Sequence, residues 1–71
     1  MTQYTFCPRF SRDDNPGRLR PGPNILGNRD AAIRYLREHP DAVEASVYRD
    51  GRYTGQVNRA TGEVAFHPVL R

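Results

Sequence analysis

The stretch that decides the fold is Val43-Glu-Ala-Ser-Val-Tyr-Arg-Asp-Gly-Arg-Tyr-Thr-Gly-Gln-Val-Asn-Arg-Ala-Thr-Gly-Glu-Val-Ala-Phe66. It contains three short runs of alternating apolar and polar residues, and glycine-containing segments separate them. This pattern predicts three short antiparallel strands, joined by turns at Asp50-Gly51 and at Arg59–Gly62.

The alternation also predicts the register of the first hairpin. A two-residue turn at Asp50-Gly51 would place Val57 on the opposite face from Val47, which a sheet with one buried face does not tolerate. A three-residue loop at Arg49–Gly51, with Gly51 at positive φ, keeps the apolar residues together. The predicted cross-strand pairs are Val47 with Tyr53, Ala45 with Gly55, and Val43 with Val57.

The second hairpin follows from the same argument. A four-residue loop at Arg59–Gly62 pairs Val57 with Val64 and Gly55 with Phe66, whose ring then covers the glycine. The predicted inner face consists of Val43, Ala45, Val47, Tyr53, Val57, Val64 and Phe66. The predicted outer face, which is polar and uncovered, consists of Glu44, Ser46, Tyr48, Arg52, Thr54, Gln56, Asn58, Ala65 and His67. Such a face stays in water or receives a partner.

An additional strand is predicted at Tyr4–Phe10. Pro8 has no N–H to donate to a ladder, so we expect an edge strand or one that ends early. The strand can pair with the first or the last strand of the meander, and both placements stay open. Its aromatic residues Tyr4, Phe6 and Phe10 share one side, either as core contacts or as a platform on which bases stack.

A short helix is predicted at Ala31–His39, between the N-terminal strand and the meander. Asn28 is a suitable N-cap, and Pro40 ends the helix. Its apolar stripe consists of Ala32, Ile33 and Leu36, with Tyr35 or His39, and it covers the inner face of the sheet. We expect His39 to act as a local cap. The predicted fold is α+β, with one helix packed on one face of a three- to four-stranded antiparallel sheet.

We expect residues 1–71 to form a single small domain, in which residues 11–27 are a loop rich in proline, glycine and arginine. A loop of this length without periodicity is either a mobile linker or a binding loop. Asp13 and Asp14 lie in it, but no third acidic residue or histidine follows at a ligand spacing. We therefore expect neither a metal site nor a cofactor.

All eleven basic residues are arginine, and the net charge is +3. Residues 1–29 hold five arginines against two aspartates, so the positive excess lies in the N-terminal part. The single cysteine excludes an internal disulfide. No segment is apolar enough to span a membrane, and the N-terminal residues lack the basic and apolar regions of a secretory signal, so we expect a cytoplasmic protein.

The sequence argues against an enzyme. No local motif joins a nucleophile to a base, no glycine-rich phosphate loop follows a strand, and a domain this small has little room for a substrate cleft. We therefore expect a protein without a small-molecule substrate.

The strand Tyr4–Phe10, the helix Ala31–His39 and the turn-rich segment Val47–Val57 together resemble small phage-encoded anti-CRISPR proteins in size, element order and composition. The resemblance implies a non-catalytic inhibitor in the cytoplasm of a bacterial host, which binds a CRISPR surveillance complex. Many such inhibitors are acidic mimics of DNA, whereas this chain has a basic N-terminal half.

Three functional hypotheses follow. The first is an inhibitor that binds a protein complex through Arg9, Arg12, Arg18, Arg20, Tyr48 and Arg52. The second is a small nucleic-acid-binding domain, in which the N-terminal arginines contact phosphates. The third is a self-assembling module, such as a homodimer, that uses the apolar residues Val69 and Leu70.

Overall fold

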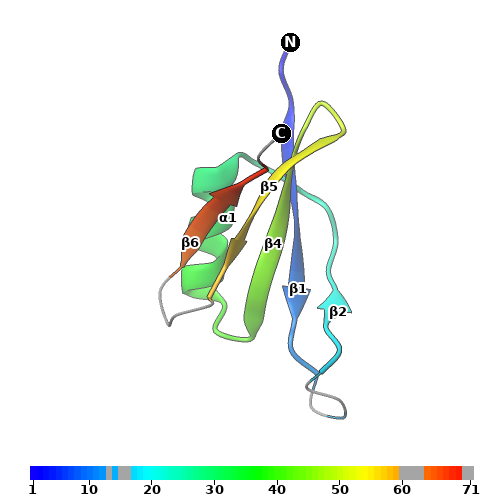
Figure 1. Cartoon of the computed structure of the whole chain (residues 1–71), viewed down its shortest axis with the longest axis vertical. Helices are drawn as coiled ribbons and strands as arrows, with labels where there is room; N and C mark the ends of the chain where they lie inside the picture. Colours follow the sequence, from blue (N-terminus) through cyan, green and yellow to red (C-terminus); the bar gives the residue numbers. More distant parts are fainter. Residues whose placement is uncertain (13, 15–16, 60–63, 70–71) are drawn as a thin grey trace.

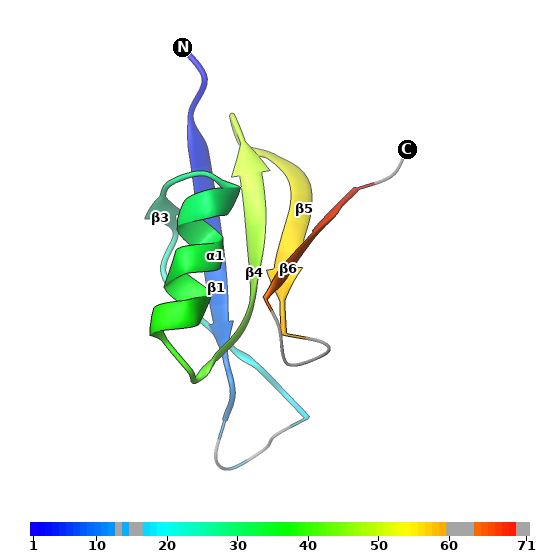
Figure 2. The ribbon, with the colours of Figure 1, turned by 90° about the vertical axis from the view of Figure 1, so that its left-hand side faces the viewer.

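Helix α1 (Arg29–Glu38) packs on one face of an antiparallel sheet in the computed structural model of the chain (Figures 1 and 2). The structure describes residues 1–12, 14, 17–59 and 64–69. The strands are β1 (Tyr4–Phe10), β2 (Arg20–Pro21), β3 (Ile25–Leu26), β4 (Ala42–Arg49), β5 (Arg52–Asn58) and β6 (Ala65–Pro68). They are ordered β2-β1-β4-β5-β6, and β3 also pairs with β1. The predicted α+β fold, with a helix between strands, is confirmed.

The ends of α1 follow from local chemistry. The side chain of Asn28 accepts a hydrogen bond of 3.1 Å from the backbone N–H of Ala31, so the predicted N-cap is confirmed. At the other end, the backbone N–H of His39 donates to the carbonyl of Tyr35 at 2.9 Å, and the His39 ring stacks on the Tyr35 ring. His39 therefore caps the helix, which spans one residue less at this end than predicted and begins two residues earlier.

The core lies between α1 and the sheet. Leu36 from the helix and Phe6, Val47 and Val57 from three strands are almost fully buried. The ring of Phe6 meets that of Tyr35 edge to face, with centroids 5.6 Å apart. The aromatic residues of β1 other than Tyr4 are thus core contacts. The whole core cluster consists of Phe6, Phe10, Ala32, Leu36, Ala42, Ala45, Val47 and Val57.

Strand β1 does not lie at the edge of the sheet, so that prediction is wrong. It pairs with β4 on one side and with β2 and β3 on the other (β2 in Figure 1, β3 in Figure 2). The Pro8 carbonyl accepts a 2.8 Å hydrogen bond from Gly22, between the segments that pair with β2 and β3. Because the nitrogen and the carbonyl of one strand residue point to the same side, Pro8 faces the gap between two short strands and disrupts neither ladder.

The segment 11–27 is not structureless throughout, because β2 and β3 lie in it and run back along β1. Gly22 makes this approach possible: a Cβ on Gly22 would lie 2.7 Å from the ring of Phe10. Residues 13, 15 and 16 of the predicted loop lie outside the described residues.

The predicted register of the first hairpin is also wrong. Val47 pairs with Gly55 and Ala45 with Val57, so each partner lies two residues further along β5 than predicted. The turn has two residues, Asp50 at φ 51° and Gly51 at φ 82°. Positive φ at both positions is typical of the type I′ turn that Asp-Gly favours.

A two-residue turn by itself would place Gly55 and Val57 on the open face. A bulge at Thr54 returns both residues to the helix side of the sheet. Tyr48 pairs with Tyr53 and Val47 with Gly55, which leaves Thr54 as the extra residue on β5. The Thr54 hydroxyl donates to the Val47 carbonyl at 3.1 Å. The apolar residues of β4 and β5 therefore share a face as predicted, although Tyr53, placed inside by the prediction, lies on the outer face.

A second bulge changes the predicted role of Val43. Arg9 pairs with Glu44 and Phe10 with Ala42, so Val43 is the extra residue on β4. Ala42 takes the buried position instead, and Val43 is only half-buried.

The second hairpin is shifted by two residues as well. Val57 pairs with Phe66 and Gly55 with Pro68, in place of the predicted partners Val64 and Phe66. The Phe66 ring nevertheless covers Gly55, because a Cβ on Gly55 would lie 2.8 Å from the ring. Most of the predicted loop Arg59–Gly62 lies outside the described residues.

Gly51→Val should lower the free energy of unfolding by about 1–2 kcal/mol, because a β-branched residue resists the left-handed conformation. A Cβ at this position meets no atom within 4 Å, so the cost is conformational and not steric. Urea denaturation measures it, and Gly51→Asn is the control because asparagine tolerates positive φ. Equal losses for both variants would contradict the type I′ turn.

Candidate functional site

The face of the sheet opposite α1 is not covered by any described element. Residues paired directly across an antiparallel sheet share a face, so the register arranges the side chains of this open face in three rows. One row is defined by Leu26, Thr5, Tyr48 and Tyr53, which come from β3, β1, β4 and β5, and it is called the tyrosine row below.

The tyrosine row combines exposed apolar and aromatic surface. Leu26 is 71% exposed and Tyr53 is 41% exposed, while Tyr48 is half-buried. The rings of Tyr48 and Tyr53 meet edge to face, with centroids 5.8 Å apart. Two aromatic side chains are thus held in a defined geometry on a rigid sheet, which lowers the entropy lost when they bind a partner.

The remainder of the open face is balanced in charge. The second row consists of Cys7, Ser46, Gln56 and His67, and the third consists of Pro21, Arg9, Glu44, Asn58 and Ala65. Arg9 and Glu44 are direct neighbours, with Nη1 and Oε2 3.9 Å apart. Arg9 is the only arginine and Glu44 the only acidic residue in the three rows, and their charges cancel.

The structure separates the predicted contact arginines. Arg12 makes a bidentate ion pair with Asp14, with Nε and Nη2 3.0 and 2.7 Å from the two carboxylate oxygens. The guanidinium of Arg20 lies over the Phe10 ring at 4.8 Å, and Arg18 is exposed. Arg12 and Arg20 therefore contact their own chain, and Arg9 alone of the four predicted N-terminal arginines lies in the rows of the open face.

Tyr48 and Arg52, predicted as two anchors on one surface, lie on opposite faces. Tyr48 pairs with Tyr53, whereas Arg52 pairs with Arg49, and successive residues of a strand point to opposite sides. Arg49 pairs in turn with Tyr4, which places both arginines on the helix side of the sheet.

Arg59 has a structural role that the sequence did not reveal. Its Nε donates to the carbonyl of Ala42 at 2.8 Å, and its Nη2 donates to that of His39 at 3.2 Å. The side chain thereby fixes the connection between α1 and β4.

Comparisons with protein-family models, curated proteins and solved structures gave no match. In the described part of the chain, no helix is long and apolar enough to cross a membrane. No group of three or more potential metal ligands gathers among the described residues either.

The sequence pattern alone does not place Leu26, Thr5 and Tyr53 together on the open face. Leu26 lay in a segment without periodicity, and Tyr53 was assigned to the core through the wrong register. The available signal for β3 was the apolar pair Ile25-Leu26 among prolines and glycines, because two adjacent strand residues point to opposite faces of a sheet.

Proposed function

We propose that the chain is a non-catalytic binding protein that docks on a partner protein through the open face of its sheet. The observation that carries the proposal is the tyrosine row, a continuous line of side chains across four strands that nothing in the described structure covers. Tyrosine is enriched among the residues that dominate binding energy at protein interfaces.

The charge distribution supports a protein partner over a phosphate backbone. Binding to a nucleic-acid backbone requires cationic side chains that contact the phosphates and release their counterions. In the rows of the open face the only arginine, Arg9, lies beside Glu44, and Arg12 is already paired with Asp14. A neutral face with two tyrosines and a leucine instead fits an interface that excludes water.

The narrower proposal is an inhibitor of a CRISPR surveillance complex, acting in the cytoplasm of a bacterial host. It is supported by the resemblance in size, element order and composition to small phage inhibitors. An inhibitor of this kind needs only a rigid surface and no catalytic centre, which agrees with a domain whose open face is a sheet. Counting phage plaques on a CRISPR-immune strain, with and without the chain, tests this step.

Tyr53→Ser should weaken partner binding about tenfold or more, as expected for an interface tyrosine. Capture of partners from bacterial lysate with the tagged chain, followed by affinity measurement with the captured protein, gives the readout. Tyr53→Phe keeps the ring and should retain most of the affinity. Arg34→Ser is the control away from the open face, because it changes an exposed residue of α1. Thermal melts show whether each variant is folded.

Two results would contradict the proposal. Unchanged affinity of a folded Tyr53→Ser variant would remove the open face as the docking surface. Capture that disappears after nuclease treatment, and that weakens log-linearly with salt concentration, would favour the nucleic-acid-binding domain instead.

A further inference from the structure

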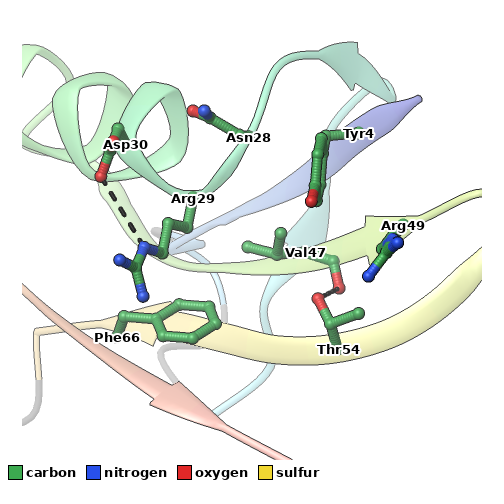
Figure 3. Close-up of a pocket in the computed structure, with 8 residues that line it drawn as sticks. All are labelled: Tyr4, Asn28, Arg29, Asp30, Val47, Arg49, Thr54 and Phe66. Carbon is green, nitrogen blue, oxygen red and sulfur yellow. Dashed lines mark hydrogen bonds and ion pairs between the residues drawn. The ribbon is translucent and has the colours of Figure 1, made fainter. Parts of the chain in front are cut away.

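A hollow on the helix side of the sheet is separate from the open face. It lies between the start of α1 and the hairpin of β4 and β5, and its volume is about 480 Å³. Its lining includes Tyr4, Arg29, Val47, Arg49, Thr54 and Phe66, and it is called the arginine hollow below (Figure 3).

The centre of the arginine hollow is apolar. Val47 is 2% exposed and belongs to the core, and Phe66 packs against that core as a half-buried side chain. Tyr4 adds an aromatic ring that is 38% exposed. The hydroxyl of Thr54 already donates its hydrogen bond to the carbonyl of Val47, so it is not a donor for a ligand at the centre of the hollow. A short aliphatic stem therefore fits here better than a bare ion does.

Two guanidinium groups flank this apolar centre. Arg29 from α1 and Arg49 from β4 lie on opposite sides of Val47 (Figure 3). The guanidinium of Arg29 lies 5.6 Å from the centroid of the Phe66 ring, which orients it along the wall of the hollow.

Neither arginine is neutralised by a strong internal pair. The only ion pair of Arg29 with a described residue is the contact of its Nε with Asp30 at 3.9 Å, between two exposed side chains, which contributes little. Arg49 makes no ion pair within the described part of the chain. With Asp30, the lining keeps a net positive charge.

We propose that the arginine hollow binds an acidic side chain of a peptide segment. The carboxylate lies between Arg29 and Arg49, and the aliphatic stem of the acidic residue packs on the accessible rings of Phe66 and Tyr4, above the buried Val47. Guanidinium groups recognise carboxylates through paired, charge-assisted hydrogen bonds, and arginine clusters are a recurrent means of reading acidic motifs. This site is independent of the tyrosine row, because the two lie on opposite faces of the sheet.

The test uses two synthetic peptides and NMR titration of the ¹⁵N-labelled protein at constant ionic strength. The probe is acetyl-Ala-Leu-Glu-Leu-Glu-Ala-amide, and the matched control carries glutamine at both glutamate positions. We expect the glutamate peptide to shift the amide signals of Arg29, Arg49 and Thr54, and the glutamine peptide to bind at least about tenfold more weakly.

Substitutions locate the binding to the hollow. Arg29→Gln and Arg49→Gln should each weaken the glutamate peptide about tenfold, because each removes one charge-assisted contact. Arg34→Gln removes the same charge from an exposed position of α1 outside the hollow and should leave the affinity within twofold. Asp30→Asn should strengthen binding, because it removes the negative charge found among the described residues of the lining.

Three outcomes would overturn the proposal. They are equal affinity for both peptides, equal weakening by Arg34→Gln and Arg49→Gln, and inorganic phosphate binding as tightly as the glutamate peptide. The last outcome would show a site for bare oxyanions in which the apolar stem has no role. None of these results tests docking through the tyrosine row, because the Tyr53→Ser variant tests that surface separately.

Discussion

Replacing Leu36 by alanine should lower the free energy of unfolding by about 2–5 kcal/mol, the usual range for a leucine removed from a packed core. Leu36 is completely buried, and it is the largest side chain that α1 places wholly inside the core. A domain of this size has a net stability of only about 3–5 kcal/mol without additional cross-links. We therefore expect a large fraction of the variant to be unfolded at 25 °C.

Circular dichroism during urea denaturation measures this loss. Leu36→Met keeps the volume of the side chain and should cost less than about 1.5 kcal/mol. Arg34→Ala, on the exposed side of the same helix, should change stability by no more than about 0.5 kcal/mol. A Leu36→Ala variant as stable as the methionine variant would mean that packing of Leu36 does not hold α1 on the sheet.

The second large effect is expected at Gly55. A Cβ at this position would lie 2.6 Å from the backbone oxygen of His67 and 3.0 Å from the Cα of Pro68, both on the neighbouring strand β6. These are backbone atoms, so they move only if β6 moves. Gly55→Val should therefore destabilise the domain by about 3 kcal/mol and separate β6 from β5.

Amide hydrogen exchange tests the location of this effect. Exchange should accelerate most at Val69, whose N–H donates to the carbonyl of Thr54 at 3.0 Å beside the β6 ladder. A double variant, Gly55→Ala with Phe66→Leu, removes the contact with the aromatic ring but keeps that with His67. The free energy of unfolding of the double variant should lie between that of Gly55→Ala and that of the unsubstituted protein. Full recovery would show that the ring, and not the strand, makes glycine necessary.

The two proposed surfaces depend on a single local feature, the hairpin of β4 and β5. Its two-residue turn places Tyr48 and Tyr53 on the open face and Arg49 and Arg52 on the helix side. Gln3 holds the hairpin in place, because its N–H donates to the Asp50 carboxylate and its carbonyl accepts from the Asp50 N–H, both at 2.8 Å. A partner that surrounds this end of the molecule would reach both surfaces.

The sequence alone determined the features that depend on neighbours along the chain. Asn28 and Pro40 delimit the helix through local hydrogen bonding and local steric exclusion, and the spacing of Ala32 and Leu36 selects its buried face. Asp50-Gly51 places a turn because both residues tolerate positive φ. The faces of most strand residues also follow from the alternation, whose period is two.

Because side chains alternate between faces with a period of two residues, the sequence pattern alone does not determine the strand register. A shift of two residues returns every side chain to the same face, so the pairs Val47–Tyr53 and Val47–Gly55 satisfy the pattern equally well. Only the tertiary structure decides between them, because the two-residue turn pairs Tyr53 with Tyr48 on the open face and the bulge at Thr54 returns Gly55 and Val57 to the helix side. The place of β1 beside β4, and the pairing of Leu26 with Thr5, are likewise long-range choices. They are decided by which arrangement buries Phe6 and Val47 under α1, and the side chains left over on the other side form the surface proposed here to bind.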